Sequence, residues 1–107
     1  MDTETVVLFQ PEEVIFKQGD PGDCMYFIRE GKVVVEIAKP EDIDKPEKYN
    51  QVAILFAGDP VGEMALVLPD GKRIATVRAI SQVVAEKTSR DGFNAMLSAA
   101  NPTLQEI

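Results

Sequence analysis

The chain has 107 residues, 45% of them hydrophobic, and 18 acidic against 11 basic side chains give a net charge of −7. This predicts one domain with a hydrophobic core, and the negative charge argues against binding of nucleic acid or anionic membrane surfaces by this chain. The absence of histidine excludes the commonest general base and His-ligated zinc or iron. The single cysteine, Cys24, predicts a reduced thiol in a cytoplasmic protein. No apolar run approaches the roughly 20 residues of a membrane span.

Short runs of β-branched and aromatic residues alternate with turn signals along most of the chain. The predicted strands are Thr5–Phe9, Glu13–Phe16, Met25–Arg29, Lys32–Ile37, Gln51–Phe56, Ile74–Ala79 and Gln82–Thr88. Glu30 and Gly31 predict a tight turn that would pair Met25–Arg29 with Lys32–Ile37 as a hairpin. Strands at this spacing predict a mainly β fold, an antiparallel sandwich or barrel.

Two segments between the strands have a different character. Lys39–Asn50 is rich in charges and contains two prolines, which predicts a polar, mobile loop. Glu63–Leu68 consists mostly of good helix formers and ends before a proline, so it predicts a short helix. Asp59 and Pro60 also fit an N-cap and a first helical residue, which would start this helix earlier and place Gly62 inside it.

The C-terminal part changes from strand to helix character. Phe93, Met96 and Leu97 stand at helical spacing after Ser89, a residue suited to an N-cap. Phe93 and Met96 are predicted to contact the core. Asn101–Ile107 reads as a second N-cap followed by proline, so another helix is predicted to begin there.

The segment from Gly62 to Arg73 has the composition of a small anion site. A glycine lets a ligand approach the backbone, and a helix N-terminus offers free N–H groups. Arg73 follows the next turn, and its guanidinium matches phosphate oxygens. Glu63 fits beside a phosphate if it accepts hydrogen bonds from a sugar hydroxyl. A solvated surface arginine is the alternative interpretation of Arg73.

Two motifs in this region resemble the phosphate-binding cassette of cyclic nucleotide-binding domains, as in the catabolite-activator family and the regulatory subunits of cAMP-dependent protein kinase. They are Gly62–Leu66 (GEMAL) and Arg73–Val77 (RIATV). Glu12–Val35, Ala57–Glu63 and Ser89–Leu97 also resemble the family, in the same order. The resemblance implies a double-stranded β-helix (jelly-roll) barrel with a short cassette helix and a C-terminal helix. It implies one domain over residues 1–107 that lacks the family's long C-terminal lid helix.

The resemblance also implies roles for the positions that match. Glu63 would accept a hydrogen bond from the ribose 2′-hydroxyl, and Arg73 would bind the cyclic phosphate. Gly62 would allow close approach of the ligand. The other implied positions complete the phosphate cradle through backbone N–H groups, at Met64, Ala65, Ile74 and Ala75, or line the nucleotide pocket, at Val35 and Val52.

The function implied is a non-enzymatic regulatory or sensor domain that binds cAMP in preference to cGMP, with no cofactor and no metal. An output domain or a second copy of the chain would be its protein partner. Ile74 stands where the family usually has alanine, serine or threonine, and a hydroxyl there favours cGMP in some members. The alternative is a degenerate fold that serves protein interaction or dimerisation without a ligand. An enzyme of the cupin kind would need metal-ligating histidines, which the chain lacks.

Overall fold

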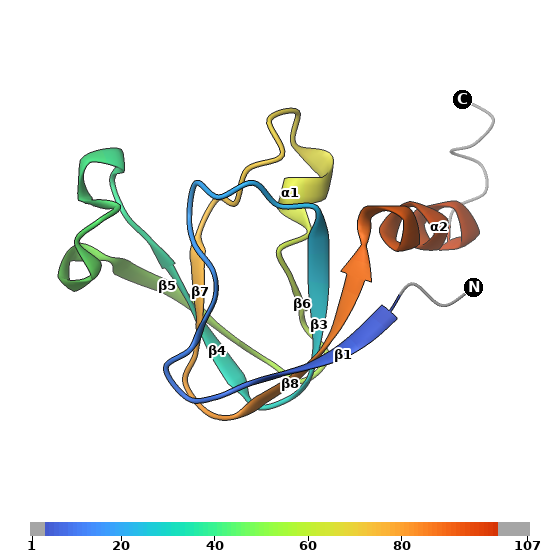
Figure 1. Ribbon diagram of the computed structural model, residues 1–107, viewed down its shortest axis with the longest axis horizontal. Coiled ribbons are helices and arrows are strands. Elements are labelled where there is room, and N and C mark those ends of the chain that lie inside the picture. The colour runs from blue at the N-terminus through green and yellow to red at the C-terminus, as the bar shows by residue number, and fades with distance from the viewer. Residues whose placement is uncertain (1–3, 101–107) are drawn as a thin grey trace.

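Two four-stranded antiparallel sheets make up most of the fold in this computed structural model, which describes residues 4–100. The sheets have the strand orders β1-β8-β3-β6 and β2-β7-β4-β5. The strands are β1 (Glu4–Phe9), β2 (Val14–Phe16), β3 (Cys24–Glu30), β4 (Lys32–Ile37), β5 (Asn50–Phe56), β6 (Pro60–Val61), β7 (Thr76–Ala79) and β8 (Val83–Ser89). The predicted mainly β jelly-roll fold is confirmed. In Figure 1 the two sheets approach each other at one end and spread apart toward α1 (Met64–Val67).

The core lies between the two sheets and takes side chains from both. Strands alternate their side chains between two faces, so the apolar residues of one face gather on the inside. The buried cluster consists of Phe9, Ile28, Val33, Val61, Val77, Ala79, Val83 and Ala85. Burial of this cluster fixes the register of β7 and thereby the face on which its flanking residues lie.

The predicted hairpin between Met25–Arg29 and Lys32–Ile37 is wrong. β3 pairs with β8 and β6, whereas β4 pairs with β5 and β7 in the other sheet. Gly31 has a φ of +92°, and a Cβ there would lie 2.1 Å from the carbonyl oxygen of Gln82. Gly31 therefore allows the sharp turn by which the chain passes from one sheet to the other. Local turn chemistry predicts the bend but not the partner of the next strand.

The first short helix begins after Gly62. Pro60 and Val61 form β6, which pairs with β3, so the alternative start of this helix at Asp59 and Pro60 is wrong. Helix α1 covers Met64–Val67, and the amide of Leu68 closes its last turn on the carbonyl of Met64. Leu66 of this helix is buried.

The C-terminal helix α2 covers Arg90–Ala100. Ser89 caps its first turn as predicted, because the amide of Gly92 donates to the Ser89 hydroxyl at 3.1 Å. Phe93 and Met96 are half-buried. The second helix predicted at Asn101–Ile107 lies outside the described residues.

The polar segment between β4 and β5 contains two short 3-10 helices, Pro40–Asp42 and Pro46–Lys48. Asp42 lies 3.7 Å from the ammonium of Lys45 and 3.9 Å from that of Lys48. The Tyr49 hydroxyl donates to the Ile43 carbonyl. The loop is predicted correctly, and its mobility stays a prediction.

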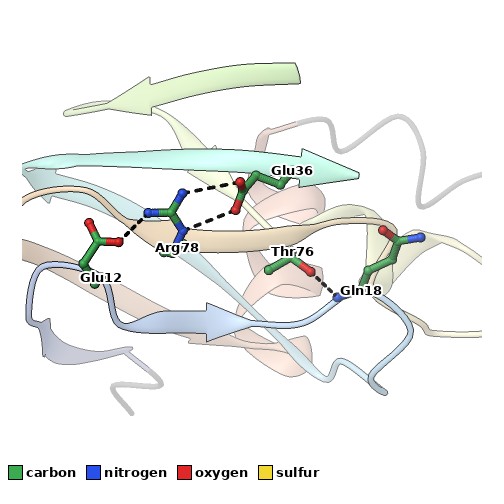
Figure 2. A network of polar contacts seen from close by, with 5 residues as sticks. All are labelled: Glu12, Gln18, Glu36, Thr76 and Arg78. Carbon is green, nitrogen blue, oxygen red and sulfur yellow. Dashed lines mark hydrogen bonds and ion pairs between the residues drawn. The ribbon is translucent and has the colours of Figure 1, made fainter. Parts of the chain in front are cut away.

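A polar network covers the outer face of the second sheet (Figure 2). Arg78 of β7 lies between Glu36 of β4 and Glu12 of the turn before β2, with N–O distances of 3.3 Å and 2.8 Å. The Thr76 hydroxyl accepts a hydrogen bond from the Gln18 amide at 3.0 Å. These contacts tie the neighbours of β7 to it on the side that faces away from the core.

Candidate ligand-binding site

The turn before α1 brings the backbone close to an arginine side chain. Gly62 has a φ of +85°, a conformation that favours glycine. A Cβ at this position would lie 2.6 Å from Nη1 of Arg73 and 2.9 Å from the Phe16 ring. The carbonyl of Gly62 accepts a hydrogen bond from the same Nη1 at 2.9 Å. Gly62 is therefore required both for its backbone conformation and for the space that Arg73 occupies.

The backbone of Arg73 is held by the loop after β2. Its amide donates to the carbonyl of Asp20, and its carbonyl accepts from the amide of Gly19, both at 2.8 Å. These bonds explain why β7 begins at Thr76 rather than at Ile74, the start that the sequence predicts. The segment at Arg73 pairs with a turn, and the sheet ladder starts three residues later.

The side chain of Arg73 is held in one position by three neutral groups. Besides the Gly62 carbonyl, Nη2 donates to the sulfur of Cys24 at 3.4 Å, and Cζ lies 4.1 Å from the centroid of the Phe16 ring. A cation over an aromatic face is attracted by the ring quadrupole, here by about 1 kcal/mol. Together these contacts orient the guanidinium without neutralising it.

Gly22 provides room for the same guanidinium. A Cβ at Gly22 would lie 2.4 Å from Nε and 2.6 Å from Cζ of Arg73, and 2.9 Å from the Cβ of Ala65. The sequence pattern indicates only a turn residue at this position. The structural role of Gly22 is the close packing of the Arg73 side chain, which no local pattern reveals.

The charge of Arg73 is unusual because the side chain is only 6% exposed. Within residues 4–100 no carboxylate lies within 4.0 Å of its guanidinium, and its Nε has no hydrogen-bond partner. Burying an unpaired cation costs several kcal/mol, so such groups normally have a counter-ion. The site therefore has the chemistry to attract an anion.

A cavity of about 470 Å³ opens in front of Arg73. All nine residues predicted to contact a ligand line it: Val35, Val52, Gly62, Glu63, Met64, Ala65, Arg73, Ile74 and Ala75. Seven further lining residues have no such signal in the sequence: Phe16, Ile37, Leu55, Asp59, Pro60, Val61 and Val77. The structure thus brings the predicted positions together, while their contacts with a ligand stay a prediction.

The cavity has a polar end and an apolar end. Arg73, Glu63 and the first turn of α1 form the polar end, where the first N–H groups of a helix lack intrahelical partners. At the mouth, Val52 is 55% exposed and Ile74 51% exposed. Val52 is the extra residue of a β-bulge, since Val35 pairs with Ala53 and the next residue pairs with Gln51. This arrangement fits a small ligand that carries one anionic group on a mostly apolar body.

Tyr26 is a neighbour of Cys24 and Phe16, two residues that contact the Arg73 guanidinium. Burial and the neighbouring Cys24 raise the pKa of its phenol to about 12, and the charge of Arg73 opposes the rise. Its ring stacks with Phe16 at a centroid distance of 6.4 Å. Tyr26 therefore packs against the aromatic ring that contacts Arg73.

Phe16 and Cys24 are the contacts of Arg73 that sequence reasoning misses. The sequence pattern gives Phe16 only the role of a strand residue and Cys24 only that of a reduced thiol. Cys24 is buried, and its reduced state stays a prediction. Neither residue has a local signal that points to Arg73, because the contacts depend on the pairing of β2 with β7 and on the start of β3.

In residues 4–100 no helix is long and apolar enough to span a membrane. No group of three histidine, cysteine or acidic side chains in this range could hold a metal ion.

The fold and the site define a jelly-roll domain with a cavity lined by a buried arginine. The sequence profile of the family described as the cyclic nucleotide-binding domain matches residues 6–100. The chain therefore belongs to the cyclic nucleotide-binding domain family, whose role in the relatives below is regulatory.

Two curated relatives are regulatory subunits of cAMP-dependent protein kinase. The subunit from Emericella nidulans is 38% identical over 90% of the chain, and that from Dictyostelium discoideum is 40% identical over 92%. The chain spans only 21% and 29% of the length of these two proteins.

Two solved structures show the same fold. An EAL enzyme in its cAMP-bound form has a TM-score of 0.77 at 30% identity, covering 94% of the chain and 25% of the enzyme. A mutant regulatory subunit of a cAMP-independent protein kinase A from Trypanosoma brucei, bound to cAMP, has a TM-score of 0.79 at 26% identity. The match covers 97% of the chain and 36% of that subunit.

Proposed function

We propose that this domain binds cAMP, in preference to cGMP, and acts as a non-enzymatic sensor whose ligand state is read by an output domain or a partner protein in the cytoplasm. The observation that carries the proposal is the buried guanidinium of Arg73, which no carboxylate of the described residues neutralises. The cyclic phosphate would supply the missing negative charge. Relatives named as cAMP-dependent and similar structures with bound cAMP support the same ligand.

The other contacts follow from the lining of the cavity. Glu63 would accept from the ribose 2′-hydroxyl, while the amides at Met64, Ala65 and Ala75 would donate to the phosphate oxygens. Ile74 contributes a branched apolar side chain at the mouth and offers no hydroxyl to a guanine base. The preference for cAMP rests on this residue.

The test is calorimetric titration of cAMP and of cGMP into the 107-residue chain and its Arg73→Ala variant. A charge-assisted contact contributes about 1.5–3 kcal/mol, so we expect Arg73→Ala to weaken cAMP binding roughly tenfold to a hundredfold. Arg78→Ala is the matched control, because it removes the same charge from the outer face. Its affinity for cAMP should equal that of the wild type.

Three outcomes would contradict the proposal. They are no heat with either nucleotide, an equal loss in the Arg73→Ala and Arg78→Ala variants, and tighter binding of cGMP than of cAMP. Thermal unfolding of both variants would show that the differences arise in folded protein.

A second candidate, an interaction module without a ligand, is favoured by the exposed apolar side chains at the cavity mouth. Val52, Met64 and Ile74 are each at least 39% exposed. In this case they would be buried against a second copy or a partner. Sedimentation of the chain with and without cAMP separates the two functions, because the module would associate without nucleotide.

A further inference from the structure

The sulfur of Cys24 is a fixed acceptor beside Arg73. Cys24 is the first residue of β3 and pairs with Ser89 of β8, so its backbone is held by the sheet. The residue is 6% exposed, and its sulfur accepts a hydrogen bond from Nη2 of Arg73 at 3.4 Å. The thiol therefore forms part of the wall against which the guanidinium is placed.

A thiol at this position orients the guanidinium and leaves its charge in place. Sulfur is a weak, neutral acceptor, whereas a carboxylate would form a charge-assisted pair with arginine. Nη1 also has a neutral acceptor, the Gly62 carbonyl. The preceding residue, Asp23, is exposed, and its carboxylate is not within 4.0 Å of the guanidinium. The strand thus places a neutral atom, rather than the nearby charge, against Arg73.

We propose that Cys24 is a positioning residue for Arg73, and that a neutral acceptor at this position sets the affinity of the cavity for the ligand phosphate. The inference rests on the proposed function. The unpartnered, buried Nε of Arg73 supports it, since the side chain is fixed at Nη1 and Nη2 while Nε has no partner in residues 4–100. The two neutral contacts direct the guanidinium, and its positive charge stays available to an anion.

Substitutions at position 24 then have graded effects on cAMP affinity. Cys24→Ser keeps a neutral acceptor and should bind cAMP within about threefold of the wild type. Cys24→Ala removes one anchor and should weaken binding by roughly threefold to tenfold. Cys24→Asp introduces an internal counter-ion that competes with the phosphate, and we expect a loss of at least about thirtyfold.

The experiment titrates cAMP into the wild-type chain and these three variants and records the phosphorus NMR shift of the bound nucleotide. Met25→Leu is the matched control, because Met25 is the next residue of β3, is also buried, and points to the opposite face of the strand from Cys24. We expect Met25→Leu to keep the affinity and the phosphorus shift. Cys24→Ala should change both, and Cys24→Ser should restore the affinity.

Three results would overturn the inference. If the wild type binds cAMP and Cys24→Ala binds equally well, the inference fails while the proposed function stands. If Met25→Leu loses as much affinity as Cys24→Ala, the effect is general packing. If the wild type binds neither nucleotide, the proposed function and the inference fail together. If Cys24→Asp does not fold, the serine and alanine variants decide.

Discussion

Arg73 and Arg78 lie five residues apart in one segment, yet they have opposite surroundings. Arg78 faces outward between two carboxylates, Glu12 and Glu36 (Figure 2). Arg73 faces the cavity, surrounded by a carbonyl, a sulfur and an aromatic ring. Two carboxylates neutralise the charge of Arg78, whereas no carboxylate of residues 4–100 lies within 4.0 Å of the Arg73 guanidinium.

The difference separates a structural arginine from a ligand-binding one. A paired arginine on a sheet face links strands and contributes modestly to stability. A buried, unpaired arginine costs folding free energy, which a bound anion would offset. A buried arginine without a carboxylate partner in residues 4–100 therefore marks a site where a bound anion would stabilise the protein.

The largest effect should come from reducing the space that Arg73 occupies. In Gly22→Ala the new Cβ would lie 2.4 Å from Nε, so the guanidinium must move. We expect cAMP affinity to fall on the order of a hundredfold, because the phosphate contact is lost. Calorimetric titration measures this loss.

The matched control for Gly22→Ala is Gly58→Ala. Gly58 has a φ of +97°, and a Cβ added there would meet no atom within 4 Å, so the substitution strains the backbone without touching Arg73. It should lower stability and leave cAMP affinity unchanged. Wild-type affinity in Gly22→Ala would show that the position of the guanidinium does not matter.

A smaller effect, on stability rather than on affinity, is expected for the ion pair between Arg78 and Glu36. Guanidinium contacts with Glu36 raise the pKa of Arg78, and both groups are partly buried. A double-mutant cycle with Arg78→Met and Glu36→Gln should give a coupling of about 1 kcal/mol in urea unfolding. The corresponding cycle with Glu12→Gln should give less, since the Glu12 side chain is 73% exposed. If the coupling of Arg78 to Glu12 exceeded its coupling to Glu36, solvent exposure would not weaken the Arg78–Glu12 pair.

A third effect concerns Tyr26, whose pKa depends on the charge of Arg73. A folded-state pKa of about 12 against an ordinary 10.0 means that the folded protein holds the phenolic proton more tightly than the unfolded chain. The resulting stability is fully present below pH 10 and is lost as the pH rises toward 12. Tyr26→Phe should remove this part of the alkaline loss.

Urea unfolding between about pH 9 and about pH 11.5 measures the effect, with Tyr49→Phe as the control. Because the charge of Arg73 lowers the pKa of Tyr26, bound cAMP should raise it further. An absorbance titration of the Tyr49→Phe chain would detect this shift. Absence of any nucleotide effect on the phenol would place the phosphate away from Arg73.

Local signals and the two motifs suffice to predict the class of fold, the family and nine of the residues around the cavity. The strands and turns have their own residue patterns, and the motifs at Gly62 and Arg73 are each contiguous in the chain. All nine predicted positions line one cavity. Seven of them belong to the two motifs, which one short helix and turn join, while Val35 and Val52 come from the paired strands β4 and β5.

The buried, unpaired state of Arg73 in residues 4–100, and the groups that hold its side chain, depend instead on tertiary contacts. The contacts of Arg73 with Phe16 and Cys24, and the space left by Gly22, join residues about 50 positions apart. The same holds for the crossing of β4 into the second sheet, where the local pattern predicts a hairpin. Strand pairing depends on burial of the whole core rather than on the adjoining turn. Local sequence patterns therefore do not predict it.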